Sequence, residues 1–397
     1  MLVPLREAGP RCGAKAATLA RLLRAGLPVP AGVVVLDALD GHGWQHELET
    51  ALGALGGGPF AVRSSAVGED GGHASFAGQL HTHLGARTPA EVVRQVRRSA
   101  ASGAAAALTA YTARLGRSPD QVAPAGGSPV LVQVLVDAEV AGVLFTHHPV
   151  TGAEQVVVEA TRGLGEALVS GRSTPQRWLV DPGAHSGAHS GAQPGADTGA
   201  LLTSAQLDEL VGTADRIEAL LGAAQDVEWA IAAGRTWILQ ARPITTTSTA
   251  GPTATESPAA GLAEPGRTRR GRVDAVELLL SGTPASPGTA TGPARTIRDL
   301  DDFARFHAGE VLVCRSTSPA WTPLLARAAA VVTEVGGILA HAAIVAREFG
   351  IPAVTDAAGA TGALTDGRPV HVDGTHGTVT ARTRDSAKEN HSAKGNQ

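Results

Sequence analysis

A histidine stands where a glycine-rich turn leads into an expected helix, and its imidazole could act as a nucleophile. A short β-branched strand ends at Thr333, and Gly336 and Gly337 then permit a tight turn. His341 follows at or near the start of the helix, where backbone N–H groups and the helix dipole favour an anion. A neutral imidazole is a competent nucleophile near pH 7. This position would therefore stabilise a phosphoryl group carried on His341.

The lysines of the chain are few and unevenly placed. Three lysines accompany 30 arginines, and Lys388 and Lys394 lie in a polar C-terminal tail, so Lys15 is alone in the expected folded body. A lysine kept where arginine is the usual cation indicates a site that needs a compact ammonium group. Chance is the alternative explanation.

A third group of polar residues lies on two expected strands near residue 240. Gln240 and Arg242 are two residues apart, so alternation places both side chains on one face. Glu228 offers a hard oxygen ligand of the kind Mg²⁺ prefers, and Asp226 shares its face. For Glu228 taken alone, a solvated strand charge is the alternative interpretation.

The elements that must position these residues indicate an α/β or α+β fold. Residues 14–25 have apolar residues at helical spacing and end at Gly26, with Pro28 beyond. Other expected helices cover residues 89–115 and 204–221. The expected strands of this part cover residues 33–36, 60–62, 130–136, 142–145, 156–158 and 237–239.

Composition divides the chain into two units. Residues 1–245 form the first, with a small-residue loop insertion at 181–200, and residues 246–272 read as a flexible linker rich in Thr, Pro, Ala and Gly. Residues 273–384 form the second unit, and 385–397 a disordered tail. The second unit has expected strands at residues 290–296, 311–314, 330–333 and 370–372, and a helix over 341–349 capped by Gly350.

Charge and composition exclude several classes of protein. The net charge is −4, which disfavours general binders of nucleic acid or anionic membranes. No apolar run reaches about 18 residues, and the N-terminus lacks a signal-peptide pattern. Cys12 and Cys314 are far apart and share no metal-ligand spacing, so a disulfide framework and a structural zinc site are not expected. We expect a cytoplasmic protein.

The string TEVGGILAHAAIVAREFGIPAV, residues 333–354, closely resembles the phosphohistidine signature of the phosphoenolpyruvate-utilising enzymes. That family includes phosphoenolpyruvate synthase, pyruvate phosphate dikinase and rifampicin phosphotransferase. In the family, the histidine at this position is the catalytic phosphoryl carrier, which implies that role for His341.

The first unit resembles the nucleotide-binding domain of the same family. The matching motifs, in chain order, include GAKAATL from Gly13, FAVRSSAVGED from Phe60, ASFAGQ from Ala74, VQV from Val132, QDVEWAI from Gln225 and ILQARPI from Ile238. The resemblance implies an ATP site made of Lys15, Arg63, Ser75, Gly78, Gln133, Glu228, Gln240 and Arg242. It also implies that Glu228 and Gln240 hold Mg²⁺. The two cations Lys15 and Arg63 suit the charge of a triphosphate.

The resemblance implies an ATP-grasp domain followed by a small swivelling phosphohistidine domain. The histidine would attack the β-phosphate of ATP, with AMP and phosphate as products, and the carrier would then swing to a phosphoryl acceptor. Attack needs reacting atoms about 3 Å apart, and the linker at 246–272 suits the required movement.

This sequence departs from the family pattern because it shows no substrate domain, and because the stretch from Lys15 to Arg63 is short. We therefore expect either a small-molecule acceptor or a separate substrate-domain protein. Two other hypotheses remain open: an ATP-dependent ligase with a phosphorylated intermediate, and a non-catalytic ATP-binding regulatory remnant.

Other polar residues near these motifs have structural interpretations. We read His147 and His148 as loop variation and Trp321 as a packing or docking residue. Arg347 either steadies the phosphoryl group or lies on the helix surface.

Overall fold

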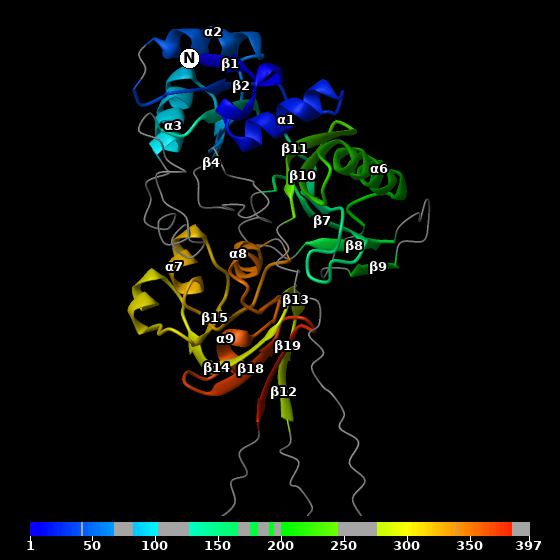
Figure 1. The fold of residues 1–397 in the computed structure, drawn as a ribbon, viewed down its shortest axis with the longest axis vertical. Coiled ribbons are helices and arrows are strands. Elements are labelled where there is room, and N and C mark those ends of the chain that lie inside the picture. The colour runs from blue at the N-terminus through cyan, green and yellow to red at the C-terminus, as the bar shows by residue number, and fades with distance from the viewer. Residues whose placement is uncertain are drawn as a thin grey trace, which may run out of the picture.

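The two expected units form three β-sheets in a computed structural model, in which the second unit lies against the first (Figure 1). The structure describes residues 1–40, 43–66, 82–101, 127–165, 175–181, 190–193, 200–244, 276–338 and 340–382. The α/β class expected from the sequence is confirmed. The linker at 246–272, the tail at 385–397 and the domain boundaries they set lie outside the described residues.

The first sheet has five strands in the order β1-β2-β5-β3-β4, all antiparallel. Its core of Val, Leu, Trp44 and Phe60 side chains is covered by α2 and α3. The elements are β1 Leu2–Pro4, α1 Ala14–Arg24, β2 Gly32–Val35, α2 Trp44–Ala54, β3 Phe60–Ser64, β4 Thr82–Ala86, α3 Pro89–Ala101 and β5 Val130–Val134.

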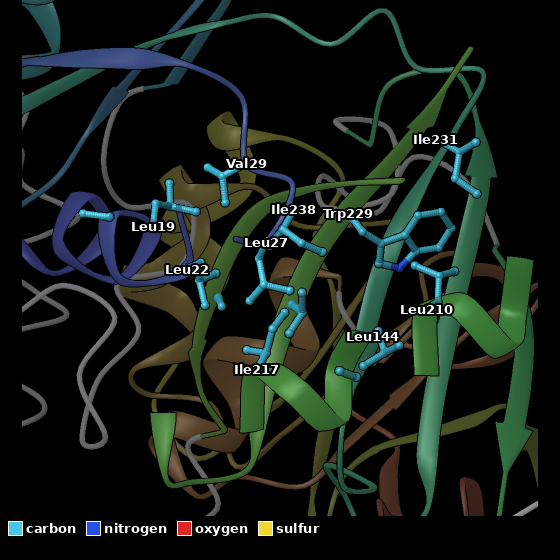
Figure 2. Packing of buried hydrophobic residues seen from close by; sticks show 14 of the residues in the cluster. Leu19, Leu22, Leu27, Val29, Leu144, Leu210, Ile217, Trp229, Ile231 and Ile238 are labelled. Carbon is cyan, nitrogen blue, oxygen red and sulfur yellow. The ribbon is translucent and has the colours of Figure 1, made fainter. Parts of the chain in front are cut away.

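The second sheet has six antiparallel strands in the order β11-β10-β6-β7-β8-β9. Figure 2 shows Leu19 and Leu22 of α1 and Leu210 and Ile217 of α6 packed with Trp229 and its neighbours on one face of this sheet. The opposite face carries polar residues on β10 and β11 and apolar residues on β6 and β7. The elements are β6 Val140–Phe145, β7 Val156–Arg162, β8 Gln176–Val180, β9 Ser190–Gln193, α6 Ser204–Leu221, β10 Gln225–Ala232 and β11 Arg235–Pro243.

The second unit is built on an eight-stranded sheet in the order β12-β19-β18-β14-β15-β16-β17-β13. The pairs from β14 to β17 are parallel, and β15, β16 and β17 are buried on both faces, as parallel strands usually are. Figure 1 shows α7 and α8 on the side toward the first unit. The elements are β12 Val276–Ser281, β13 Thr283–Ser286, β14 Thr289–Thr296, β15 Val311–Cys314, α7 Thr322–Leu325, β16 Ala330–Thr333, α8 His341–Phe349, β17 Ala353–Thr355, α9 Ala360–Ala363, β18 Pro369–Asp373 and β19 Thr378–Arg382.

Most expected elements occur, with a few differences. The helices α1, α6 and α8 match the predicted ranges to within a residue, and Gly350 caps α8 in the left-handed region at φ 65°. The segment 181–200 was expected to be a loop, but residues 190–193 form β9 and pair with β8. Its small residues form a strand because β8 offers a free sheet edge. The helix α2 was not predicted from its weakly patterned sequence.

None of the helices among the described residues has the length and apolar character that a membrane span needs.

Gly142 of β6 gives a test of the second sheet. A Cβ there would lie 2.0 Å from the Glu159 carbonyl oxygen and 2.6 Å from the Trp229 ring. We predict that Gly142→Ala lowers the free energy of unfolding by about 1–3 kcal/mol, because β6 must shift away from β7. Urea denaturation of the purified protein measures the change.

Gly212→Ala is the matched control for that prediction. Gly212 lies inside α6, and a Cβ there meets no atom within 4 Å. Alanine stabilises a helix interior by up to about 1 kcal/mol relative to glycine. Equal stability of the two variants would contradict the close packing of β6 on β7.

Candidate active site

The pairing of β10 with β11 brings four polar side chains to one face of the second sheet. Asp226 is opposite Arg242, and Glu228 is opposite Gln240. Directly opposed residues in an antiparallel pair have side chains within contact distance. The intervening residues Val227 and Ala241 point to the other face, into the core under α1 and α6. The alternation predicted for these residues is therefore present in the structure.

Arg63 of β3 joins the first sheet to this face. Its Nη2 donates to Glu228 Oε2 at 2.8 Å and to Gln240 Oε1 at 2.6 Å, while Nη1 donates to the Leu239 carbonyl oxygen at 2.7 Å. The guanidinium group thus bridges the two side chains that the sequence assigns to Mg²⁺. The bridge links residues more than 160 positions apart in the chain.

The charges on this face favour an ionised Glu228. Burial raises the pKa of the Glu228 carboxyl, but nearby positive charge outweighs burial and holds that pKa below its ordinary value. The cations, in order of effect, are Arg63, Arg242 and Lys15. The site therefore holds a carboxylate among three cations, an arrangement that suits a phosphate chain and a metal ion together.

Asp226 is buried beside Arg242. Arg242 Nε and Nη2 lie 2.8 and 2.7 Å from Asp226 Oδ2. Burial raises the pKa of Asp226, and the charge of Arg242 offsets this only in part. Among the described residues, Asp226 Oδ1 has no hydrogen-bond partner. Asp226 thus orients Arg242. The sequence pattern placed Asp226 on this face but did not predict its partner.

Lys15 lies in the first turn of α1, against the end of β3. Its Nζ donates to the Ser64 carbonyl oxygen at 3.3 Å. Ser65 Oγ accepts from Ala16 N at 3.0 Å and donates to the Cys12 carbonyl oxygen at 2.8 Å, so it fastens the start of α1. Gly13 has φ 82°, and a Cβ there would lie 1.6 Å from the Ser65 carbonyl oxygen. A residue with a side chain would therefore displace Lys15 from the site.

The oxygens of Glu228 and Gln240 fit a magnesium ion. Both accept hydrogen bonds from one cationic nitrogen, which shows that a positive centre can occupy the space between them. Mg²⁺ usually takes one or two protein oxygens and completes its shell with phosphates and water. Accordingly, within the described residues there is no cluster of three or more His, Cys, Asp or Glu side chains that could hold a metal alone.

His341 is the first residue of α8 and is buried. Its Nδ1 lies 2.8 Å from Thr317 Oγ1, and its Nε2 lies 3.5 Å from Thr322 Oγ1. The Thr322 hydroxyl donates to the Pro319 carbonyl oxygen at 2.9 Å, so its proton is not directed at Nε2. Burial lowers the pKa of His341 to about 3. The imidazole is therefore neutral at physiological pH, as a nucleophile must be.

The turn before His341 contacts the first unit. Ile338 N lies 3.4 Å from Glu159 Oε1 of β7, and the Ile338 side chain is buried with Val143, Phe145 and Val157. Full burial of an isoleucine contributes about 2 kcal/mol. In α8, Arg347 lies close enough to Asp226 and Arg242 for their charges to affect its pKa, which burial lowers to about 10. His341 thus lies on a unit that contacts β6 and β7 of the second sheet.

The remaining predicted residues have simpler positions. Gln133 lies on β5 and donates Nε2 to the Pro30 carbonyl oxygen at 3.1 Å. Ser75 and Gly78 lie outside the described residues. The structural interpretations of His147 and His148 agree with their contacts, since His147 Nε2 lies 3.1 Å from Glu218 Oε1 and His148 Nδ1 accepts from Val150 N. The roles of all these residues in ATP binding stay predictions.

Trp321 and Arg347 also have packing roles. Trp321 packs edge-on against Phe303, and Arg347 Nη1 donates to the Ala285 carbonyl oxygen at 2.7 Å. Sequence analysis missed Thr317 and Glu159. The available signal for Thr317 was its place in the loop after a buried strand. For Glu159 it was a carboxylate within a β-branched strand.

Two family models match the chain. One, described as pyruvate phosphate dikinase, AMP/ATP-binding domain, matches residues 44–260. The other, described as PEP-utilising enzyme, mobile domain, matches residues 306–377. The two matched segments contain most of the polar face and His341 respectively.

The curated proteins most similar to this chain include several phosphoenolpyruvate synthases, which agrees with the two family models. A probable phosphoenolpyruvate synthase of Methanothermobacter thermautotrophicus is 36% identical over 80% of this chain and 46% of its own length. The phosphoenolpyruvate synthase of Pyrococcus furiosus is 35% identical over 80% of this chain and 40% of its own. That of Aeropyrum pernix is 32% identical over 94% of this chain and 56% of its own. The chain spans about half the length of these relatives.

The buried imidazole gives a prediction for pH. Because its folded pKa is about 3, the unfolded chain binds one more proton at this residue between pH 3 and about 6.5. The contribution of His341 to stability is therefore present above pH 6.5 and is lost as pH falls below it, by up to about 1.4 kcal/mol per pH unit. We expect the ring resonances of His341 not to titrate between pH 8 and 5 in NMR spectra.

The matched control for that experiment is His341→Gln. The variant should lose less thermal stability than the wild type when the pH is lowered from 7 to 5. Identical pH dependence of both proteins, or titration of His341 near pH 6.5, would contradict the buried neutral imidazole.

Proposed function

The chain belongs to the family of phosphoenolpyruvate-utilising enzymes, and from this membership we propose that it transfers a phosphoryl group from ATP to its own His341. The observation that carries the proposal is that a neutral, buried histidine starts a helix in a unit docked beside a face rich in cations. Phosphoryl transfer is catalysed mainly by positioning and by charge stabilisation. Both requirements are served by this arrangement.

The cations and oxygens of the polar face have distinct roles in the proposal. Lys15, Arg63 and Arg242 bind the phosphate oxygens of ATP, and Glu228 with Gln240 holds Mg²⁺. When bound, the ion neutralises phosphate charge. Arg63 then releases the two oxygens that it bridges in this structure and turns its guanidinium group to the phosphates.

In the proposed reaction, His341 Nε2 attacks the β-phosphorus of ATP. A bond forms between Nε2 and phosphorus, and the bond from the β-phosphorus to the oxygen of the α-phosphate breaks, so AMP leaves. Water then releases the terminal group as inorganic phosphate. In this proposal Nδ1 donates its proton to Thr317 Oγ1, so that Nε2 carries the lone pair that attacks.

The phosphorylated unit would then carry its group to an acceptor. The relatives are named phosphoenolpyruvate synthases, so a small keto acid is one acceptor class. The acceptor is bound either by this chain or by a separate substrate-domain protein. We place the reaction in the cytoplasm, where ATP is abundant.

Labelled ATP tests the proposal. We predict that purified protein given Mg²⁺ and ATP labelled at the β-phosphate acquires acid-labile label and forms AMP. His341→Ala should acquire none, while His371→Ala, a change at an exposed histidine of the same unit, should acquire the wild-type amount. Formation of ADP in place of AMP would contradict the proposed bond cleavage. ATP binding without label would favour a regulatory protein.

Thr317 gives a second prediction. Thr317→Val removes the hydroxyl that contacts Nδ1 and should slow labelling at least tenfold, because the imidazole loses its fixed orientation and tautomer. Thr317→Ser keeps the hydroxyl and should retain most of the rate. ATP affinity, measured by calorimetry, should be the same in both variants. If Thr317→Val were labelled as fast as the wild type, the proposed role of Thr317 would be contradicted.

A further inference from the structure

We propose that Gly337 and Ile338 form the docking element that holds the carrier unit at the nucleotide, and that Glu159 is the positioning residue that receives it. This inference rests on the proposed function, because it assigns the contact that brings His341 to ATP. The observation is that the turn before His341 is inserted against β7 of the first unit.

The first argument is the space at Gly337. A Cβ at this position would lie 2.6 and 2.7 Å from the two carboxylate oxygens of Glu159, and 3.0 Å from its carboxyl carbon. The φ of Gly337 lies outside the left-handed region, so its own backbone conformation does not call for glycine. The neighbouring Gly336, at φ 116°, does need that freedom. The three atoms that a Cβ at Gly337 would meet first therefore all belong to Glu159 of the first unit.

The second argument is the burial of Ile338. Its side chain is 1% exposed and clusters with Val143, Phe145 and Val157, all of which belong to the first unit. Ile338 thus packs into an apolar site formed by side chains of β6 and β7. When the carrier leaves, this side chain and the apolar site become exposed together. Docking is therefore favoured by apolar burial and needs no side-chain charge on the turn.

The third argument is the fixed position of Glu159. Arg177 of β8 donates Nε to Glu159 Oε1 at 2.9 Å and Nη2 at 2.5 Å. The same oxygen lies 3.4 Å from Ile338 N. The Glu159 side chain is fully buried, while that of Arg177 is 24% exposed. The ion pair with Arg177 therefore fixes the position of the Glu159 carboxylate, which lies against the backbone of Gly337.

Gly337→Ala tests the docking element without touching the reacting groups. The added methyl group collides with Glu159 in the docked position but is tolerated by the turn itself. We expect ATP-dependent labelling of His341 to slow at least tenfold, with ATP affinity unchanged. Gly362→Ala is the matched control, since Gly362 lies in the same unit, outside the left-handed region, with no atom within 4 Å of an added Cβ. It should label at the wild-type rate.

A double variant tests Glu159. Glu159→Ala removes the carboxylate that a Cβ at residue 337 would meet, so Gly337→Ala combined with Glu159→Ala should label at least threefold faster than Gly337→Ala alone. Such a rescue is not expected of a residue with a merely structural role. A double variant no faster than Gly337→Ala would overturn the assignment of Glu159.

Hydrogen exchange gives a readout of docking that does not depend on the reaction. In Gly337→Ala, amides in the peptides around Ile338 and around Val157 should exchange at least threefold faster than in wild type, while those of Gly362→Ala should not change. Unchanged exchange, or labelling of Gly337→Ala at the wild-type rate, would overturn the docking proposal.

Phosphoramidate separates this inference from the proposed function. It phosphorylates histidine directly: the bond from phosphorus to ammonia breaks, the bond from phosphorus to imidazole forms, and ammonia leaves. Gly337→Ala should react with phosphoramidate at least as fast as wild type, because this reaction needs no docking at the nucleotide. If wild type took no label from ATP, the proposed function would fail, and the exchange experiment would still decide the docking. Slower reaction of Gly337→Ala with phosphoramidate would overturn the docking proposal, because the variant would then be damaged at the carrier itself.

Discussion

The arrangement of the site depends on the register of β10 and β11. A slip of one residue in β10 would turn Asp226 and Glu228 into the core under α1 and α6, and a slip in β11 would do the same to Gln240 and Arg242. The core fixes the register, because Val227, Ala241 and Trp229 must face the helices. The same register then places Asp226 opposite Arg242 and Glu228 opposite Gln240. Apolar packing on one face of a sheet therefore determines the charge arrangement on the other.

Two further contacts position the cations Arg63 and Lys15, which lie outside the second sheet. Arg63 crosses from β3 to Glu228 and Gln240, and Ser65 fastens the start of α1 so that Lys15 lies beside Ser64. Arg63, Ser64 and Ser65 are consecutive residues at the end of β3. One strand thus delivers both Arg63 and the anchor of Lys15, which makes the end of β3 the junction between the two sheets.

Patterns within a short stretch of sequence predicted much of the fold and part of the site. The start of α8 at His341, its cap at Gly350 and the alternation of Gln240 and Arg242 all follow from spacing of a few residues. The bridge made by Arg63 and the role of Glu159 could not be predicted in this way, because each depends on strands or units far apart in the chain. Glu159 lies in the strand sequence VVVEATR and has no local signal of its contact with Ile338. Such residues are fixed by tertiary packing, which spacing does not encode.

An unsatisfied oxygen at the contact between the two units has a kinetic consequence. Among the described residues, Glu159 Oε2 is buried there without a hydrogen-bond partner. Each such group raises the free energy of the docked arrangement, since water would satisfy it once the units part. If every buried polar atom of the interface were hydrogen-bonded, the two units would dissociate more slowly. In the proposed function the second unit must leave the first in every cycle, and a contact with an unsatisfied polar atom makes that separation faster.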